Sequence, residues 1–401
     1  MSEQFIARQP ILDTELRVFA YELLFRGGPQ NAFQPYANAS SSVIADSITL
    51  FDLQLLTGSA LAFVNMDEVA LRLGAARLLP ADRIVVEILE TVRPTEEILG
   101  ICRELRADGY RFALDDFMDE PAMAPMVELA QFLKVDFQLM DSERREFISH
   151  KYRGGKIALL AEKVETRAEM EEARNLGFRY FQGYFFCKPS MMETRDISGN
   201  KLIQLQLLSA VSQPELDSDA IEQLLKQDPS FLYRLLRYMN SPVLGLRSEV
   251  SSIRNAIALL GEREFRRWAS IFAVISMMNG KSPELIRTAL TRAYFCEEFS
   301  GQAGLNEQGY TLFLMGLLSI SDALLDRPIA DVLNSLAVSQ DLKSALCGGT
   351  NKLNDVYQLL LALERAEWPE LANCVQRIGC PEKKVPDSYQ LAIQKAAGIA
   401  T

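Results

Sequence analysis

Acidic and amide side chains recur within or just after short apolar runs in the first half of the chain. Glu22 lies in VFAYELLF, Asn65 in LAFVNM and Glu87 in RIVVEIL. Asp115 and Asp116 follow the run RFAL. Oxygen ligands of this kind are those that Mg²⁺ and Mn²⁺ prefer, and a site for two ions needs several of them. These residues therefore form a candidate divalent-cation site.

Further polar residues extend this set. Lys134 lies in FLKVDFQ, Glu162 in KIALLAEKV and Gln182 in YFQGYFF. A lysine beside metal carboxylates can orient a water molecule, and a nearby glutamate can accept its proton. Charged side chains are rarely buried unless they are paired or bind a metal, so chance explains the joint pattern poorly. The alternative is a set of buried ion pairs without any metal.

Short apolar runs alternate with amphipathic stretches from residue 5 to about residue 190. Eight of the runs are strand candidates, over residues 5–12, 18–25, 61–66, 83–89, 111–117, 132–138, 156–164 and 180–186. The pattern predicts an α/β, TIM-like (β/α)8 barrel, with an open doubly wound sheet as the competing architecture. In a parallel barrel the carboxyl ends of the strands meet at one mouth, which is where these polar residues would lie.

The pattern changes after Pro189. From about Asn200 apolar residues recur three and four positions apart, as in LIQLQLLSAV and IEQLLKQ. This spacing predicts an all-α helical domain. We therefore expect two domains, over residues 1–195 and 196–401.

Composition narrows the functional classes. The formal net charge of −11 argues against binding to nucleic acid or to an anionic membrane, because both need a positive face. The sequence has no apolar run of about 18 residues and no export signal at its start, so no membrane association is expected. We expect the six cysteines to be reduced thiols in the cytoplasm. The single histidine, His150, excludes chemistry that needs a histidine cluster.

The order of these motifs resembles the EAL domain, a family of metal-dependent cyclic di-GMP phosphodiesterases, over roughly residues 5 to 190. The matching stretches are RQPIL, YELLFR, FVNM, VVEILE, LDDF, LKVD, LLAEKVE and FQGYFFCKP. The resemblance implies a bacterial signalling protein with Mg or Mn as cofactor, cyclic di-GMP as ligand and a homodimer as assembly.

The resemblance also implies a role for each site residue. It implies metal ligands at Glu22, Asn65, Glu87, Asp115 and Asp116, a water-orienting Lys134, a general base at Glu162, a contact of Gln182 with water or substrate, a phosphate contact of Arg26, and a loop-bracing Glu165.

The sequence departs from the EAL pattern in two loops. The family loop that reads approximately DFGTGYSS is DFMDEPAMAP here, where Asp119 and Glu120 add negative charge near the expected phosphate site. Lys163 stands at the glycine of AEGVE. These changes predict a degenerate domain that binds a ligand or regulates a partner with weak or no hydrolysis. The alternatives are an active Mg- or Mn-dependent phosphodiesterase that produces pGpG, and a scaffold that binds no nucleotide.

The second half resembles the HDOD domain over about residues 200 to 390, most clearly in QDPSFLYRLLRYMNS and IRNAIALLG. HDOD domains share the scaffold of HD phosphohydrolases, whose metal ligands include histidines. Ser319 and Ile320 stand where the His-Asp pair of a catalytic HD domain would be, and no histidine follows His150. We therefore expect a non-catalytic domain that contacts an unknown protein partner.

One cluster of the second half is a candidate partner surface. Arg263, Arg266 and Arg267 lie beside Trp268, and arginine and tryptophan are frequent at interaction hot spots. The alternative is a helix whose apolar side packs in the core while its arginines face water.

Overall fold

The computed structural model describes residues 4–27, 53–187, 199–228, 252–277 and 281–400, together with positions 232, 233, 236, 237 and 240. The chain forms two compact units. The first comprises residues 1–188 and 361–371, and the second comprises residues 189–360 and 372–401. The predicted boundary between residues 195 and 196 lies outside the described residues.

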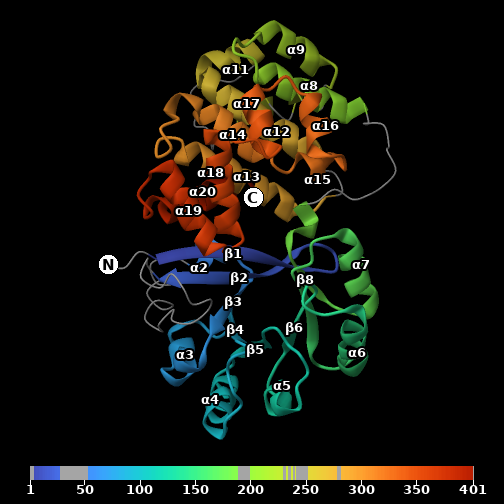
Figure 1. Cartoon of the computed structure of the whole chain (residues 1–401). Coiled ribbons are helices and arrows are strands. Elements are labelled where there is room, and N and C mark those ends of the chain that lie inside the picture. The colour runs from blue at the N-terminus through green and yellow to red at the C-terminus, as the bar shows by residue number, and fades with distance from the viewer. Residues whose placement is uncertain are drawn as a thin grey trace. The chain divides into compact units, whose positions relative to one another are not determined.

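The first unit contains a closed barrel whose strands follow one another in sequence order (Figure 1). The strands are β1 (Gln4–Asp13), β2 (Val18–Gly27), β3 (Leu61–Met66), β4 (Ile84–Ile88), β5 (Arg111–Leu114), β6 (Phe132–Asp136), β7 (Ala158–Glu162) and β8 (Tyr180–Gln182). Each strand lies at one of the apolar runs predicted to be a strand. The barrel is therefore confirmed, and the open doubly wound sheet is wrong.

Strand β1 departs from the expected parallel arrangement. Strands β2 to β8 pair in parallel, whereas β1 runs antiparallel to both β2 and β8. Residues 14–17 alone connect β1 to β2, and a parallel crossover would need about a dozen residues or more. The backbone N–H of Leu16 closes this turn by donating to the carbonyl of Asp13 at 3.0 Å. The wholly parallel barrel is therefore wrong at this strand.

Helical segments lie between consecutive strands from β2 to β8, and one more follows β8. They are α2 (Leu53–Thr57), α3 (Glu68–Arg72), η2 (Ala75–Leu78), α4 (Glu96–Ala107), η3 (Pro121–Met123), α5 (Ala124–Val127), α6 (Ser142–Tyr152), α7 (Arg167–Leu176) and η4 (Tyr184–Cys187). Thr95, Asp141 and Thr166 cap α4, α6 and α7 by accepting hydrogen bonds from backbone N–H groups of the first turn. These caps fix where the chain turns from each strand end into its helix.

A layer of apolar side chains fills one level of the barrel interior. The layer consists of Ile11, Ala20, Phe63, Val85, Ala113, Phe132, Ala158 and Leu160. The rings of Phe63 and Phe132 meet edge to face with their centroids 5.3 Å apart, and Phe19 stacks on Tyr180 at 4.0 Å. Such aromatic pairs contribute about 0.5–1.5 kcal/mol each beyond the area they bury. The polar residues lie next to this packed layer, nearer the carboxyl ends of the strands.

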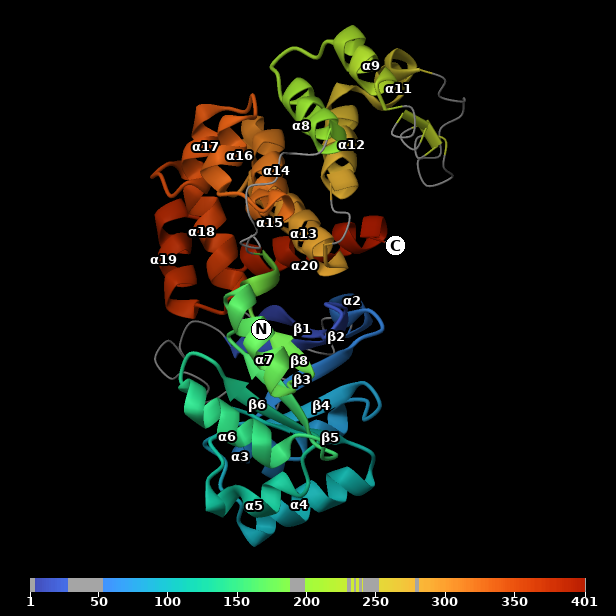
Figure 2. The same ribbon diagram turned by 90° about the vertical axis from the view of Figure 1, so that its right-hand side faces the viewer.

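The second unit is all-helical over its described residues, which confirms the second fold class. Its helices are α8 (Gly199–Val211), α9 (Ser218–Lys226), α11 (Ile253–Leu260), α12 (Glu262–Met277), α13 (Pro283–Phe299), η6 (Asn306–Gln308), α14 (Gly309–Leu318), α15 (Ser321–Leu325), α16 (Ile329–Asn334), α17 (Gln340–Leu346), α20 (Lys384–Ala400) and the parts of α18 (Lys352–Glu364) and α19 (Trp368–Ile378) outside residues 361–371. Helix α13 packs against α14 and α20 (Figure 2). At Gly316 of α14, an added Cβ would lie 2.4 Å from the carbonyl oxygen of Arg292, so the close approach of α13 and α14 requires glycine there.

Candidate functional site

The polar residues of the barrel lie two positions after the apolar layer on their strands. Successive side chains of a strand point to opposite faces, so residues two apart point the same way, here into the barrel. The pairs are Ala20 and Glu22, Phe63 and Asn65, Val85 and Glu87, Ala113 and Asp115, Phe132 and Lys134, Leu160 and Glu162, and Tyr180 and Gln182. The strand register thus gathers these predicted site residues into a second, polar layer.

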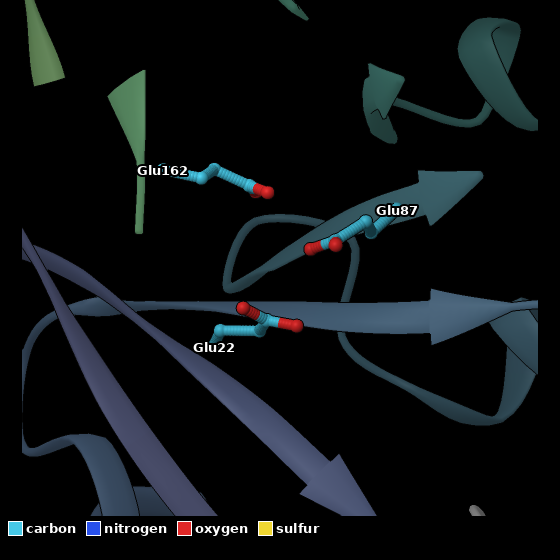
Figure 3. Close-up of side chains that lie close together, drawn as sticks. All are labelled: Glu22, Glu87 and Glu162. Atoms are coloured by element: carbon cyan, nitrogen blue, oxygen red, sulfur yellow. The ribbon is translucent and has the colours of Figure 1, made fainter. Parts of the chain in front are cut away.

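Three carboxylates of this layer face one another. Figure 3 shows Glu22, Glu87 and Glu162 pointing into a common space from β2, β4 and β7. One oxygen of each lies within 4.8 Å of an oxygen of the other two. Glu87 is fully buried, and Glu22 and Glu162 are 7% and 6% exposed. Like charges this close and this buried repel strongly, so the group requires a cation.

Lys134 supplies one positive charge to this group. Its ammonium lies 3.0 Å from Asp115 Oδ1 and 3.6 Å from Glu22 Oε2. It also forms ion pairs with Glu87 and Glu162. The lysine is 1% exposed. A single ammonium therefore faces four carboxylates.

The pKa values in this layer follow from burial and this charge arrangement. Burial and the neighbouring Glu22 raise the pKa of Glu87 well above its usual value, against the attraction of Lys134. Burial would also raise the pKa of Asp115, but the Lys134 ammonium holds that pKa below its ordinary value. Burial would lower the pKa of Lys134, yet the surrounding carboxylates raise it well above its usual value. The positive charge of Lys134 is thus favoured, and a further cation at this site would oppose the rise in the pKa of Glu87.

Four buried oxygens of the polar layer accept no hydrogen bond, and an unsatisfied buried acceptor costs about 1–3 kcal/mol. They are Asn65 Oδ1, Glu87 Oε2, Gln182 Oε1 and Glu162 Oε1, of which the last forms an ion pair with Lys134. Glu22 is oriented by Asn65, which donates to it at 2.9 Å, and by Gln182, which donates at 2.5 Å. A hard divalent cation such as Mg²⁺ or Mn²⁺ takes oxygens of this kind. Glu22, Asn65 and Glu87 therefore fit such an ion.

A second carboxylate group lies at the ends of β4 and β5. Glu90, Asp115 and Asp116 offer oxygens that lie within 4.8 Å of one another. Burial and the charge of Asp115 raise the pKa of Asp116. Sequence reasoning missed Glu90, because an acidic residue just after an apolar run resembles an ordinary solvated loop residue. Its spacing of three from Glu87 was the available signal.

The loop after Asp116 is held by contacts of its own. The backbone N–H of Phe117 donates to the carbonyl of Lys134 at 2.8 Å. Asp119 accepts hydrogen bonds from the Tyr152 hydroxyl at 2.6 Å and from the Lys151 ammonium at 2.7 Å. The charge of Asp119, which we expected to oppose phosphate binding, is therefore compensated by α6. In this loop the contacts of Asp119 with Lys151 and Tyr152 hold a sequence that lacks the glycines of the family pattern.

Asp136, at the end of β6, was not predicted as a site residue. It is 1% exposed, and its Oδ1 accepts from the backbone N–H groups of Gln138 at 2.6 Å and Leu139 at 3.0 Å. Its other oxygen pairs with the ammonium of Lys163. Asp136 therefore links the loop after β6 to the loop after β7.

The roles implied for Arg26 and Glu165 stay predictions. Arg26 lies in β2 opposite Phe5, and its side chain is outside the described residues. Glu165 is exposed just before α7, where its backbone N–H donates to Glu169 at 2.7 Å.

The positions expected to replace the His-Asp pair lie at the end of α14. Ser319 Oγ donates to the carbonyl of Gly316 at 2.8 Å and accepts from Arg292 at 3.1 Å. Burial raises the pKa of the nearby Asp322. Within the described part of the chain, the carboxylate groups that could hold a metal ion both belong to the barrel. The only histidine, His150, has a side chain that is 70% exposed on α6.

The arginine cluster of α12 is partly buried. Arg266 is 8% exposed and donates to the carbonyls of Gln213 at 2.5 Å and Pro214 at 3.1 Å. Arg267 pairs with Glu264 at 2.7 Å and with Glu297. The expectation that all the arginines face water is therefore wrong for Arg266 and Arg267. Both residues connect α12 to neighbouring segments of the helical unit.

Comparisons with known proteins identify both halves. The EAL domain family matches residues 64–189, and the HDOD domain family matches residues 201–341. The chain is 36% identical to the "Cyclic di-GMP phosphodiesterase CdgJ" of Vibrio cholerae, over 92% of this chain and 86% of that protein. It is 30% identical to the "Uncharacterized protein YuxH" of Bacillus subtilis, over 91% of each chain. The chain therefore belongs to the family of signalling proteins that join an EAL domain to an HDOD domain.

Solved structures with EAL domains are also similar. The YkuI protein of Bacillus subtilis, in complex with cyclic di-GMP and calcium, is 22% identical with a TM-score of 0.38, over 58% of this chain and 72% of that one. BlrP1 of Klebsiella pneumoniae, in a manganese and cyclic di-GMP complex, is 22% identical with a TM-score of 0.39, over 46% and 55% of the two chains.

Among the described helices of our protein, none combines the length and apolarity needed to cross a membrane.

Proposed function

We propose that the barrel is a divalent-cation-dependent phosphodiesterase that opens cyclic di-GMP to linear pGpG, and that the helical domain is a non-catalytic contact domain for a protein partner. The observation that supports this most is the convergence of Glu22, Glu87 and Glu162 in one buried layer. The name of the CdgJ relative, which matches over most of this chain, supports the same reaction.

Each group of the polar layer has a role in this reaction. A bound Mg²⁺ or Mn²⁺ stabilises charge that develops on the phosphate. Lys134 orients the attacking water, and Glu162, its ion-pair partner, accepts the proton of that water. Gln182 holds Glu22 in place through its 2.5 Å hydrogen bond and contacts the water or the substrate.

The ligand and the remaining residues complete the proposal. Asp115 and Asp116, which belong with Glu90 to the second carboxylate group, are the further cation ligands of the proposal. Arg26 contacts a phosphate of cyclic di-GMP, and Glu165 braces the loop between β7 and α7. The protein acts in the cytoplasm as a homodimer.

A turnover assay tests this function. Purified full-length protein is incubated with cyclic di-GMP and Mn²⁺, and linear pGpG is followed by chromatography. We expect turnover in the wild type and a loss of at least about 100-fold in Glu87→Gln, because a metal ligand is removed. Glu104→Gln, which removes an exposed charge on α4, should retain full activity. Equal turnover of all three proteins, or none in the wild type, would refute the proposal.

A second candidate function is binding of cyclic di-GMP without hydrolysis, the degenerate domain expected from the sequence. The pairing of Lys163 with Asp136 favours it, because this lysine has no counterpart in the AEGVE pattern. Calorimetry separates the cases. Binding tighter than about 10 μM, roughly −7 kcal/mol, without pGpG formation would support this candidate. Absence of binding would leave a scaffold that takes no nucleotide.

A further inference from the structure

Four consecutive strand ends of the barrel place one lysine among four carboxylates. Glu90 follows β4, Asp115 and Asp116 follow β5, Asp136 ends β6, and Lys163 follows β7. Adjacent strands β4 to β7 pair in parallel, so these ends lie side by side at one mouth. The positive charge of the Lys163 ammonium therefore acts on the second carboxylate group, which consists of Glu90, Asp115 and Asp116.

The backbone holds Lys163 in an unusual conformation. Its φ of +52° lies in the left-handed region, which is strained for a residue other than glycine. Two contacts keep the residue there. Gln138 Nε2 donates to its carbonyl at 3.2 Å, and its ammonium pairs with the buried Asp136. The strain is thus offset by contacts that fix where the ammonium lies.

The Lys163 ammonium lies beside the end of β5, because its ion-pair partner Asp136 ends β6, the strand that pairs with β5. Burial and the charges of Asp115, Asp136 and Glu90 raise the pKa of Asp116, and the positive charge of Lys163 opposes that rise. Asp116 Oδ1 is a buried oxygen that accepts no hydrogen bond. An ammonium thus acts on each of the two carboxylate groups. Lys134 pairs with Glu22, Glu87 and Glu162 and also with Asp115, whereas Lys163 acts on Asp116 from its ion pair with Asp136.

We propose that Lys163 is a built-in cation that takes the place of a second divalent ion at the group of Glu90, Asp115 and Asp116. The barrel then takes up one divalent cation, at the group of Glu22 and Glu87, and admits a second only when the Lys163 charge is removed. This inference rests on the proposed cation-dependent function. It concerns the number of ions and is independent of turnover.

Electrostatics gives the size of the effect. An ammonium and a divalent ion a few ångströms apart repel each other strongly where they are buried and less strongly where water screens them. The Lys163 side chain is 53% exposed, so the screened case applies. Removal of the charge should strengthen binding of a second Mn²⁺ at least about tenfold, which corresponds to about 1.4 kcal/mol.

Mn²⁺ binding tests the proposal. Calorimetry and electron paramagnetic resonance are applied to full-length wild type, Lys163→Gln and Lys156→Gln. The last variant removes an exposed lysine just before β7, at the opposite end of that strand from Lys163. Glu87→Gln provides the background of non-specific binding to an acidic protein.

We expect one specific Mn²⁺ in the wild type and in Lys156→Gln, with the spectrum of an isolated ion. In Lys163→Gln we expect two ions and the spectrum of a coupled pair, because ions in two-metal sites lie about 3.5–4 Å apart. Lys163→Gly should behave like Lys163→Gln. Because glycine also relieves the strain of the positive φ, this second variant keeps the test valid if Lys163→Gln folds poorly.

The outcomes are distinct. Two specific ions in the wild type, or one ion in both Lys163 variants, would overturn the inference while leaving the phosphodiesterase proposal intact. No specific ion in the wild type would overturn both. One ion in the wild type without pGpG formation would leave the inference standing and contradict the proposed reaction.

Discussion

Lys134 is the residue on which the polar layer of the barrel depends. It is nearly fully buried and pairs with carboxylates from four other strands or strand ends. Buried charges are tolerated when they are paired, so the lysine and the carboxylates each offset the energetic cost of burying the other. The same arrangement that holds the layer together also prepares it for a cation.

Replacement of Lys134 by Met should destabilise the barrel. Without a divalent cation we expect the free energy of unfolding to fall by about 3–5 kcal/mol, because several buried carboxylates lose their partner. Added Mn²⁺ should restore part of the loss. Hydrogen exchange of peptides from β4 and β6 at increasing urea concentration measures the change in the unit concerned.

Arg103→Met is the matched control for this experiment. It removes an ion pair with Glu96 at 3.6 Å whose side chains are 56% and 87% exposed. Exposed pairs contribute about 0–1 kcal/mol. An effect of the same small size for both variants would show that Lys134 does not hold the carboxylates together.

The cysteines allow a separate test of burial. Cys102 in α4 is fully buried, and burial raises the pKa of its thiol to about 11, whereas Cys347 is exposed. At pH 8 only about one Cys102 thiol in a thousand would be ionised, and the thiolate is the reactive form. Native protein should therefore react first with a thiol reagent at Cys347, and Cys102 should react only after unfolding. Labelling at Cys102 in the native state, located by mass spectrometry, would contradict the core described here.

Among the secondary-structure elements, β8 approaches the loop after β7 closely, and the backbone N–H of Val164 donates to the carbonyl of Gln182 at 2.9 Å. Gly183 has φ of +142°, and an added Cβ would lie 2.0 Å from the carbonyl oxygen of Val164 and 2.6 Å from its backbone nitrogen. Gly183→Ala should therefore push β8 and this loop apart and cost about 1–3 kcal/mol of stability. Turnover should fall as well, since Gln182, which holds Glu22 in place, adjoins the displaced atoms.

Gly100→Ala provides the comparison for Gly183. Nothing lies within 4 Å of a Cβ added at Gly100 in α4, and alanine is favoured over glycine in a helix by about 1 kcal/mol. We expect unchanged or slightly higher stability and unchanged turnover for this variant, measured by urea unfolding and the pGpG assay. Similar losses for both variants would indicate that the β7–β8 contact is not specific.

The sequence predicted all eight strands and the polar layer, because both depend on local alternation. Glu22, Asn65 and Glu87 were recognisable as polar residues within apolar runs, and their convergence follows once the barrel closes. The antiparallel β1 was missed, although the short connection before Val18 indicated a hairpin. Asp136 was missed because its partner, Lys163, is 27 residues away and belongs to another loop. The pairing of two loops depends on tertiary distance and a positive φ, which no local pattern displays.

The whole chain combines two units of different chemistry. Candidate metal-binding carboxylates within the described residues lie in the barrel, and the only histidine is on α6 of that unit. In the helical unit, the Ser319 hydroxyl donates a hydrogen bond to the carbonyl of Gly316 and accepts one from Arg292. We therefore expect that hydrolysis, where measured, depends on the first unit alone.

Substitutions in the helical unit test this division. Ser319→Ala and Asp322→Asn should leave Mn²⁺-dependent formation of pGpG within about twofold of the wild type, because neither residue takes part in a metal site. Glu22→Gln in the barrel should reduce the rate by at least about 100-fold. A comparable loss in Asp322→Asn with an unchanged far-UV circular dichroism spectrum would assign a catalytic contribution to the HDOD domain.

The most direct test of the barrel site is the position of a bound ion. Crystals of the full-length protein grown with Mn²⁺ and cyclic di-GMP would be measured near the manganese absorption edge. We expect an anomalous difference peak between the side chains of Glu22, Asn65 and Glu87. A map with no peak there, or with these side chains turned away from one another, would contradict the account.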